Sequence, residues 1–329
     1  MALFVVDTQF RSLQDDLGKS HIAAFAAGTR HNLWCQWKAY IMFCLYFSLK
    51  WLPASEHVVA LFAQFLSRSF RSADSVQSYV SGTKLLHIIL NQSCTAFDNL
   101  GLKLAIRGIR RSIRHAPKQA LPITVEMLVH MYQVMDMANV NHVVFWSLFT
   151  LAFFTMSRKS NLVVTNHTLP VKCLRKADIC VTEGYNMLLV VFRWSKTNQF
   201  GSRVHTVPLL PISGSPLCPV KAYIHMRSLV KVSDCSPAFC MVKNGCITPV
   251  TYYELHKFLR DTLSKLGYNS DLYSSHSFRR GAATLAFRRG VHPSLIKAIG
   301  DWSSEAYKEY IHLDLVDKMV AIRKMFVNQ

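Results

Sequence analysis

The stretch from His276 to His312, HSFRRGAATLAFRRGVHPSLIKAIGDWSSEAYKEYIH, determines how the rest of this chain is interpreted. It begins with a histidine and an arginine three residues apart, His276 and Arg279. Side chains at that spacing lie one above the other on a single face of a helix, so both can bind one ligand. The apolar side of the predicted helix is made by Phe278, Ala282, Leu285 and Ala286.

Two short helices with tight turns are predicted within this stretch. The first is expected to stop at Gly290, and the second to run from Pro293 to Gly300. An indole and two phenols follow, at Trp302, Tyr307 and Tyr310. A cation, an imidazole, an indole N–H and a phenol in this order suit a site that binds an anion and forms a covalent intermediate.

The order of these residues resembles the catalytic end of the tyrosine recombinases, the phage-integrase-like family. The family pattern is H-x-x-R, then Gly followed within two residues by His or Trp, then a nucleophilic Tyr in a Y-x-H-like ending. The matching residues here are His276, Arg279, Trp302 and Tyr310. The family usually places its tyrosine nine residues beyond the His or Trp, whereas Tyr310 lies eight beyond Trp302, so Tyr307 remains the alternative nucleophile.

An arginine upstream extends the resemblance. Arg158 follows a long apolar segment, and no acidic residue between Asp136 and Asp178 can pair with it locally. A guanidinium in that place is either a buried ion-pair partner or an anion ligand. The family carries its first catalytic arginine within R-x-S-E, and the match here ends in Asn161 in place of the acid, so a supporting contact is expected to differ.

Strand signals surround a lysine that the resemblance also singles out. Strands are predicted over 179–181, 187–194 and 203–210, with SKTNQFG as the turn between the last two. A lone lysine in a turn is ordinarily solvated. The family places a catalytic lysine on such a hairpin, which implies that role for Lys196.

The side chains suit phosphodiester chemistry at an anionic, sluggish electrophile. Guanidinium groups stay charged and bind phosphate through two parallel hydrogen bonds, which suits Arg158 and Arg279. The attraction of both guanidinium groups for the phosphate would become stronger as negative charge develops in the transition state. Trp302 would pack the pocket and offer its indole N–H to an oxygen.

The resemblance implies a phosphotyrosine route. Tyr310 would attack the phosphorus, and its phenol, with an ordinary pKa near 10, needs nearby cations or a base to lose its proton. His276 would assist that transfer or bond the phosphate, and Lys196 would protonate the leaving 5′-oxygen. The product is a 3′-phosphotyrosyl DNA that keeps the bond energy. No ATP, metal or other cofactor is therefore expected, and the sequence has neither a Walker loop nor a cluster of acids for Mg²⁺.

The charge of the whole chain favours a polyanionic partner. Its 329 residues contain 38 Lys and Arg against 19 Asp and Glu, a formal net charge of +19. The excess is spread over both parts, with 14 basic and 6 acidic residues up to Gln119 and 24 and 13 from Ala120 onward. The plain alternative is a basic protein that binds no nucleic acid. Double-stranded DNA is the expected partner.

Residues 20–115 are predicted to be helix after helix. Thr29 is the expected cap of the first, Ser55 opens another, and 73–90 gives a third. The fourth carries five cations and no acid over twelve residues, opposite an apolar stripe. A solvated face is the alternative, but the single sign favours a helix that faces DNA. Its basic ridge consists of Lys103, Arg107, Arg110, Arg111 and Arg114.

The chain is expected to be mainly α with a small β-sheet, in two domains. Two prolines in 116–123 mark the linker between residues 1–117, a helical-bundle core-binding domain, and 118–329, an α+β catalytic domain. The resemblance implies that the bundle clamps the DNA duplex opposite the catalytic domain. Helices are predicted from Thr124, over 143–156, 216–230 and 251–266, while 235–248 has no interpretation beyond a loop or short hairpin.

Nine cysteines without paired C-x-x-C spacing indicate reduced thiols of an intracellular protein. Cys235, Cys240 and Cys246 are loosely clustered, and a zinc site there is disfavoured because suitably spaced partners are missing. The N-terminus lacks a basic region and a cleavage-like site, so secretion is not expected. Apolar runs at 40–49 and 143–156 are shorter than the ~20 residues a bilayer crossing needs.

Three functions remain open at this point. The first is an active site-specific recombinase or integrase, the second a DNA-binding descendant without strand transfer, and the third a type IB topoisomerase-like enzyme. The string around Trp302 is most similar to recombinases of eukaryotic mobile elements, Crypton- or DIRS-like, which implies a nuclear location. A bacterial source would place the protein at the nucleoid instead.

The tail predicts assembly. Leu315, Met319, Ile322 and Phe326 recur at steps of four, three and four, which is an apolar stripe on a helix. The stripe either packs on its own domain or docks on a neighbouring protomer, as family members commonly do with their last helix. Docking implies a homodimer or a tetramer on paired DNA sites.

Overall fold

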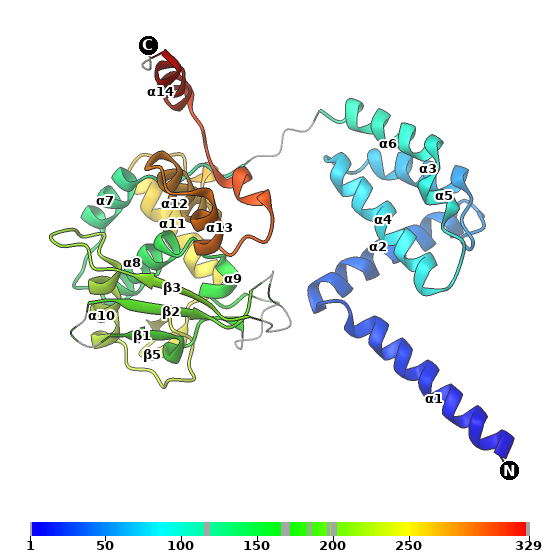
Figure 1. Cartoon of the computed structure of the whole chain (residues 1–329), viewed down its shortest axis with the longest axis horizontal. Helices are drawn as coiled ribbons and strands as arrows, with labels where there is room; N and C mark the ends of the chain where they lie inside the picture. The colour runs from blue at the N-terminus through cyan, green and yellow to red at the C-terminus, as the bar shows by residue number, and fades with distance from the viewer. Residues whose placement is uncertain are drawn as a thin grey trace. The chain divides into compact units, whose positions relative to one another are not determined.

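A computed structural model describes residues 2–114, 119–165, 172–182, 184, 186–195, 198 and 203–326 (Figure 1). The chain divides into two compact units, an N-terminal unit, Met1–Pro117, and a C-terminal unit, Lys118–Gln329. The division falls within the proline-containing segment 116–123. No helix in the described ranges is long and apolar enough to cross a membrane.

The regular elements among the described residues of the N-terminal unit are all helices, as Figure 1 shows. Apolar side chains of the last five helices form its core, which includes the buried Tyr40 and Phe62 packed edge to face at 5.2 Å. Side-chain oxygens of Ser55, Ser72 and Asn99 accept backbone N–H bonds at three helix starts. The helices are α1 (Ala2–Ala23), α2 (Ala27–Tyr46), α3 (Glu56–Ser67), α4 (Ala73–Ile89), α5 (Thr95–Asp98) and α6 (Leu100–Ser112).

Two expectations about this unit are wrong in detail. The helix expected to be capped by Thr29 starts earlier, with Ala26 as an N-cap that makes no side-chain bond. The first turn of α2 is exposed and lacks a side-chain cap, and the first buried residue of the helix is Leu33. The other error concerns Arg114, which lies beyond the end of α6 because the helix stops at Ser112 and Ile113 turns to an extended conformation.

The C-terminal unit is built around α8 (Val140–Phe154), which is buried over most of its length. The helix begins where Asn139 accepts two backbone N–H bonds, and its side chains are apolar nearly all round, as a central helix requires. The predicted cap Thr124 is confirmed, and Thr251 caps the helix predicted over 251–266. The other helices are α7 (Val125–Val134), α9 (Lys159–Leu162), α10 (Pro219–Leu229), α11 (Tyr252–Lys265), α12 (His276–Arg288), α13 (Pro293–Ile299) and α14 (Leu315–Phe326), with 3₁₀ turns η2 (Lys176–Asp178), η4 (Ser270–Leu272) and η5 (Glu305–Tyr310).

Three antiparallel strands make the main sheet, in the order β1 (Ile179–Val181), β2 (Leu188–Phe192) and β3 (His205–Leu209). Val190 of β2 is the central register point, opposite Ile179 on one side and Val207 on the other. All three are buried, because alternate side chains of β2 face the core. The region left without interpretation forms a two-stranded hairpin, β4 (Cys240–Lys243) and β5 (Cys246–Pro249).

Helix α12 approaches the preceding chain closely, and a glycine makes this possible. The backbone N–H of Ile123 donates to the carbonyl of Ser277 at 3.0 Å, and a Cβ on Gly281 would clash with the carbonyl of Ile123. The predicted stop is also confirmed, since Gly290 follows the helix with a φ of 72°, which glycine adopts without strain. The first turn of α12 is thereby fixed against the core, and it carries His276 and Arg279.

Candidate active site

The guanidinium of Arg279 lies at the centre of the candidate site. Its side chain is 1% exposed, and one nitrogen, Nη1, donates to the backbone carbonyl of Met156. Met156 lies in the turn after α8 and has a φ of 48°, an unusual value for a residue other than glycine. The contact joins the start of α12 to the end of the central helix, two segments that are 123 residues apart.

Two aromatic rings cover Arg279. Its guanidinium carbon lies 3.6 Å from the ring centroid of Trp302 and 5.0 Å from that of Tyr310. The two rings are 5.2 Å apart in a T-shaped arrangement. Gly300 is needed here because a Cβ at that position would clash with the indole of Trp302.

Hydrogen-bond donors without partners concentrate around this cation. In the described ranges, Nε and Nη2 of Arg279, Nε of Arg280, Nε1 of Trp302 and Oγ of Ser275 are buried without a bond. Buried donors are normally satisfied, and an unpaired one costs free energy. Three of these atoms are N–H donors of Arg279 and Trp302, which pack against each other, so an anion with several oxygens suits them.

Burial and charge both act on the Arg279 cation. Burial lowers the pKa of Arg279 to about 9, and the positive charge of Arg158 acts in the same direction. The guanidinium therefore stays charged at neutral pH. An anion bound in the site would raise the pKa of Arg279 again, because it stabilises the charged guanidinium.

Arg158 lies on the other side of the turn after α8, as the residue before α9. Its side chain is 17% exposed, and Nη1 is 3.9 Å from Oδ2 of Asp301. It lines a pocket together with Asn161, Ser195, Arg279 and Asp301, which we call the Arg158 pocket. The structure thus brings both predicted arginines to one pocket and supplies an acid that the sequence did not suggest.

His276 lies at the exposed edge of the site, at the first residue of α12. Its ring centroid is 6.3 Å from that of Tyr310. Partial burial lowers the pKa of His276 below its ordinary value, and the charges of Lys159, Arg279 and Arg158 lower the pKa further. At neutral pH the imidazole is therefore neutral and able to accept a proton.

The two tyrosines differ in their surroundings. Tyr307 is buried, 5% exposed, with its ring 6.4 Å from that of Trp302. Tyr310 is partly exposed and contacts the rings of both His276 and Trp302. A substrate can reach Tyr310, whereas Tyr307 belongs to the core. The predicted lysine, Lys196, lies outside the described residues.

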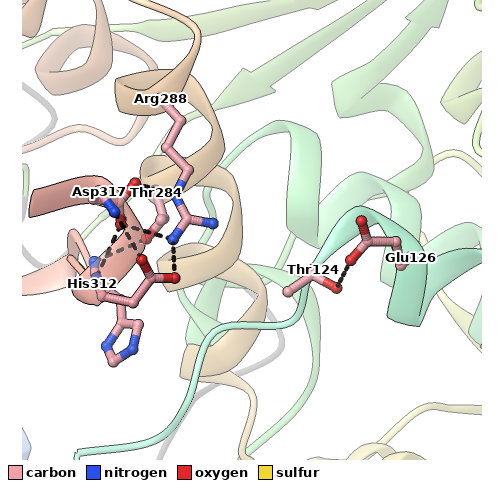
Figure 2. Close-up of polar contacts among 7 residues, drawn as sticks. Thr124, Glu126, Thr284, Arg288, His312 and Asp317 are labelled. Atoms are coloured by element: carbon pink, nitrogen blue, oxygen red, sulfur yellow. Dashed lines mark hydrogen bonds and ion pairs between the residues drawn. The ribbon is translucent and has the colours of Figure 1, made fainter. Parts of the chain in front are cut away.

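The segment that carries Tyr310 is tied to one face of α12. Nη1 of Arg280 donates to the carbonyl of Glu309 at 2.8 Å, and one turn later Oγ1 of Thr284 accepts from the N–H of His312 at 2.9 Å. A further turn on, Arg288 donates to the carboxylates of Asp314 and Asp317, as Figure 2 shows. Side chains at steps of four on a helix share one face, so these contacts follow the segment from Glu309 to Asp317.

Several residues of the site escaped prediction from sequence. Asp301, Ser195 and Arg203 form a bonded group in which Ser195 Oγ donates to Asp301 at 2.5 Å and Arg203 makes an ion pair with the same carboxylate. Lys159 sits with its ammonium 3.5 Å from the ring centroid of Tyr252. Ser195 and Asp301 are about a hundred residues apart in the sequence, so their spacing gave no signal. The one usable sign was Asn161, because it replaces the acid of the R-x-S-E pattern and so implies that another residue supplies the negative charge.

The predicted basic ridge is exposed on α6. Lys103, Arg107, Arg110 and Arg111 are on the helix, opposite the buried Leu102, Ile106 and Ile109, and Arg114 is exposed beyond its end. Arg110 also forms an ion pair with Asp74 of α4 at 2.9 Å, with both side chains largely exposed. An exposed pair of this kind contributes little to stability.

No group of three or more His, Cys, Asp or Glu that could hold a metal ion occurs among the described residues. The three cysteines that cluster in the sequence do not converge on one site: Cys240 is buried, while Cys235 and Cys246 are exposed. The donors that the candidate site offers are instead guanidinium, indole and imidazole nitrogens, which suit an anion.

No family model matches the sequence, and no curated protein matches it significantly. Solved structures of tyrosine recombinases do match in fold. The XerH site-specific recombinase bound to palindromic difH in a post-cleavage complex is 17% identical with a TM-score of 0.57, over 83% of this chain and 73% of that one. The Tn1549 transposon integrase in complex with circular intermediate DNA is 13% identical, with a TM-score of 0.58 over 93% and 98% of the two chains.

A lambda integrase dimer bound to a core site is also similar, at 13% identity and a TM-score of 0.52, over 94% of this chain and 77% of that one. Identities this low establish similarity of fold alone. The chain has the mostly helical fold with small antiparallel sheets that these recombinases share, as its sequence predicted.

The pKa of His276 provides a test of the site geometry. We expect Arg158→Gln to raise the pKa of His276, because it removes one of the positive charges that disfavour the imidazolium. The same substitution should leave the pKa of His256 unchanged, because the charges that lower that pKa come from Arg260 and Lys159. Titration of the imidazole signals by NMR measures both.

The matched control is Arg260→Gln, which should raise the pKa of His256 and leave His276 where it was. Lys159→Gln should raise both. An Arg158→Gln protein in which His276 titrates as before would contradict the arrangement described here.

Proposed function

We propose that this protein is a site-specific DNA recombinase or integrase that cleaves and rejoins DNA strands through a 3′-phosphotyrosine intermediate. The observation that carries the proposal is the buried Arg279, with two free nitrogens, packed against the rings of Trp302 and Tyr310. The shared fold supports it, since the similar structures are recombinases and integrases, several of them with DNA.

The donors would hold the scissile phosphate between the two arginines. The free Nε and Nη2 of Arg279 present two parallel N–H groups, the geometry that fits two phosphate oxygens. Arg158 lines the same pocket, and the indole N–H of Trp302 is an uncharged third donor. These groups are fixed before substrate arrives, so they stabilise developing charge without reorganisation.

Proton transfers would be divided between two residues. The neutral His276 beside Tyr310 would accept the phenolic proton as the oxygen attacks phosphorus, and the leaving 5′-oxygen would receive a proton from Lys196. The phosphorus–oxygen bond to Tyr310 forms as the bond to the 5′-oxygen breaks. Attack by a 5′-hydroxyl then reverses the step and restores the phenol.

The second function, a DNA-binding descendant without strand transfer, is disfavoured because the described catalytic candidates remain together in one site. The third, a type IB topoisomerase-like enzyme, would use the same residues on one duplex. Strand exchange between two duplexes distinguishes the first function from the third. The sequence around Trp302, DWSSEAYKEYI, leads us to propose that the protein belongs to a eukaryotic Crypton- or DIRS-like element and acts in the nucleus.

We further propose that the protein acts as a homodimer or tetramer on paired sites. Helix α14 forms as predicted, and its stripe is exposed at Leu315, Met319 and Ile322, while the side chain of Phe326 lies outside the described part. Exposed apolar side chains in a row favour a protein partner over packing within the chain. A head-to-tail exchange of this helix would close a ring of subunits.

The nucleophile is tested with two matched substitutions. Tyr310→Phe should abolish the covalent protein–DNA adduct while DNA binding persists, and Tyr307→Phe should keep the adduct, because Tyr307 is buried in the core. Covalent trapping on genomic fragments, in excess EDTA and without nucleotide, is the measurement. The opposite pattern would identify Tyr307 as the nucleophile, and a strict need for Mg²⁺ would rule out the metal-free route.

The ridge on α6 is tested by salt dependence. Replacing Arg107, Arg111 and Arg114 with Gln should weaken duplex binding and flatten the plot of log affinity against log salt, by roughly one unit for each phosphate that the protein no longer neutralises. The control is the double variant Arg30→Gln with Lys38→Gln, which removes two cations outside the ridge. Both residues are exposed on α2. If both sets change the slope equally per charge removed, the ridge has no special role.

Assembly is tested by deletion of residues 314–329. The shortened protein should fold and bind a single DNA site as a monomer, because the stripe on α14 is exposed and not part of its own core. It should no longer form a complex of two sites. Mass photometry with DNA measures this, and tetramers that survive the deletion would contradict exchange of the tail.

A further inference from the structure

Asp301 interacts with Ser195, Arg203 and Arg158 at the edge of the candidate active site. The residue directly precedes Trp302 and is 6% exposed. Its carboxylate accepts from Ser195 Oγ at 2.5 Å, makes an ion pair with Arg203, and lies 3.9 Å from Nη1 of Arg158. A buried carboxylate needs such partners, because an unpaired charge away from water is costly.

The backbone at this position is unusual in a way that serves the carboxylate. Asp301 has a φ of 54°, in the left-handed region that few residues other than glycine adopt. Its N–H donates to the carbonyl of Ala298 at 3.2 Å, and the N–H of Trp302 donates to Lys297 at 3.0 Å. One turn after α13 therefore positions both the carboxylate and the indole that covers Arg279. Strained conformations of this kind persist where the surrounding structure requires them.

The amide of Asn161 explains why the acid is not where the R-x-S-E pattern has it. Nδ2 of Asn161 donates to the carbonyl of Trp194 at 2.6 Å. A carboxylate at 161 has no proton for that carbonyl and would be repelled by it. Asn161 and Asp301 both line the Arg158 pocket, so the negative charge absent from one side is present on the other.

Asp301 also connects both arms of the segment that includes Lys196. Ser195 precedes the lysine directly and is 4% exposed, and Arg203 lies just before β3. Both arms meet at the one carboxylate. Two guanidinium groups against one carboxylate still leave a net positive charge for a phosphate.

We propose that Asp301 is a positioning residue, which orients the guanidinium of Arg158 and fixes the ends of the segment that carries Lys196. It does so in place of the acid that the R-x-S-E pattern has at position 161. The chemical consequence rests on the proposed strand-transfer function, whereas the effect on Arg158 does not.

The first experiment uses the full-length protein without DNA. Arginine side chains are labelled with ¹⁵N, and the signals of Arg158 and Arg203 are assigned by Arg→Lys variants. Asp301→Asn, which keeps the shape and removes the charge, should speed exchange of the Arg203 guanidinium protons by about tenfold, as loss of a charged hydrogen bond implies. It should also speed exchange at Arg158 and shift its signals, because the ion pair at 3.9 Å is lost. The control is Asp178→Asn, a carboxylate 3% exposed and paired with Arg193 outside the Arg158 pocket, which should leave both signals unchanged.

The second experiment measures adduct formation in single turnover, on duplexes that the wild-type protein selects from a random library. Asp301→Asn should slow the reaction about a hundredfold, the effect expected of a misplaced catalytic group. On a duplex with a neutral methylphosphonate at the scissile position, Asp301→Asn should slow the reaction by a much smaller factor. The uncharged group depends less on the positive charge of Arg158 than a phosphate does. Asp178→Asn should slow neither reaction. In an Arg158→Ala background, Asp301→Asn should slow the reaction by a smaller factor than in the wild type, because only its effect on the segment that carries Lys196 remains.

The outcomes separate the two proposals. Guanidinium signals of Arg158 that do not respond to Asp301→Asn would overturn the positioning role, whatever the DNA experiments show. Equal losses on the two substrates, or losses that add fully to those of Arg158→Ala, would overturn it as well and assign Asp301 to folding alone. A wild-type protein that forms no adduct on any duplex would count against strand transfer, and the arginine spectra would still decide the role of Asp301.

Discussion

A guanidinium that is 1% exposed, with two nitrogens unbonded, imposes conditions on everything packed around it. Removing such a cation from water costs several kcal/mol unless other groups compensate. Here compensation comes from a backbone carbonyl at the end of α8 and from the face of Trp302. The carbonyl contact requires Met156 to adopt a left-handed backbone conformation. The indole contact requires glycine at position 300, because a Cβ there would clash with Trp302. The compensation is incomplete, and an anion with two oxygens would complete it.

Charge in the site is balanced around this cation. Partial burial lowers the pKa of His276, and the positive charges of Lys159 and Arg158 lower it further. Asp301 supplies a negative charge that pairs with Arg158 and Arg203. A site with more carboxylates would repel a phosphate, and a site with none would leave Arg158 without a fixed position. The network therefore combines a positive field with rigid donors, which is the requirement for stabilising charge in a transition state.

The sequence predicted the parts of this site that follow from local spacing. His276 and Arg279 share the first turn of α12, and glycines end both short helices, because helix geometry alone determines these relations. Long helices with strong apolar patterns were found for the same reason. Contacts between distant segments, such as Ser195 with Asp301, leave no periodic trace, and the early start of α2 was missed because no side chain caps it. Arg114 was placed on α6 because cations continue past the point where the helix ends.

Contacts along α12 hold the segment that carries Tyr310, the proposed nucleophile, separately from the tail. Arg280, Thr284 and Arg288 hold the chain from Glu309 to Asp317 against the same helix that carries Arg279. Tyr310, the proposed nucleophile, is therefore held against the same helix that carries Arg279, the proposed phosphate ligand. Beyond Asp317 the apolar side chains of α14 are exposed, so this helix can bind a partner while the contacts at Glu309 and His312 stay intact. A partner that pulls on α14 would act first on the ion pairs of Arg288, which lie nearest to that helix along the chain, and only then on the bonds of Glu309 and His312 beside Tyr310.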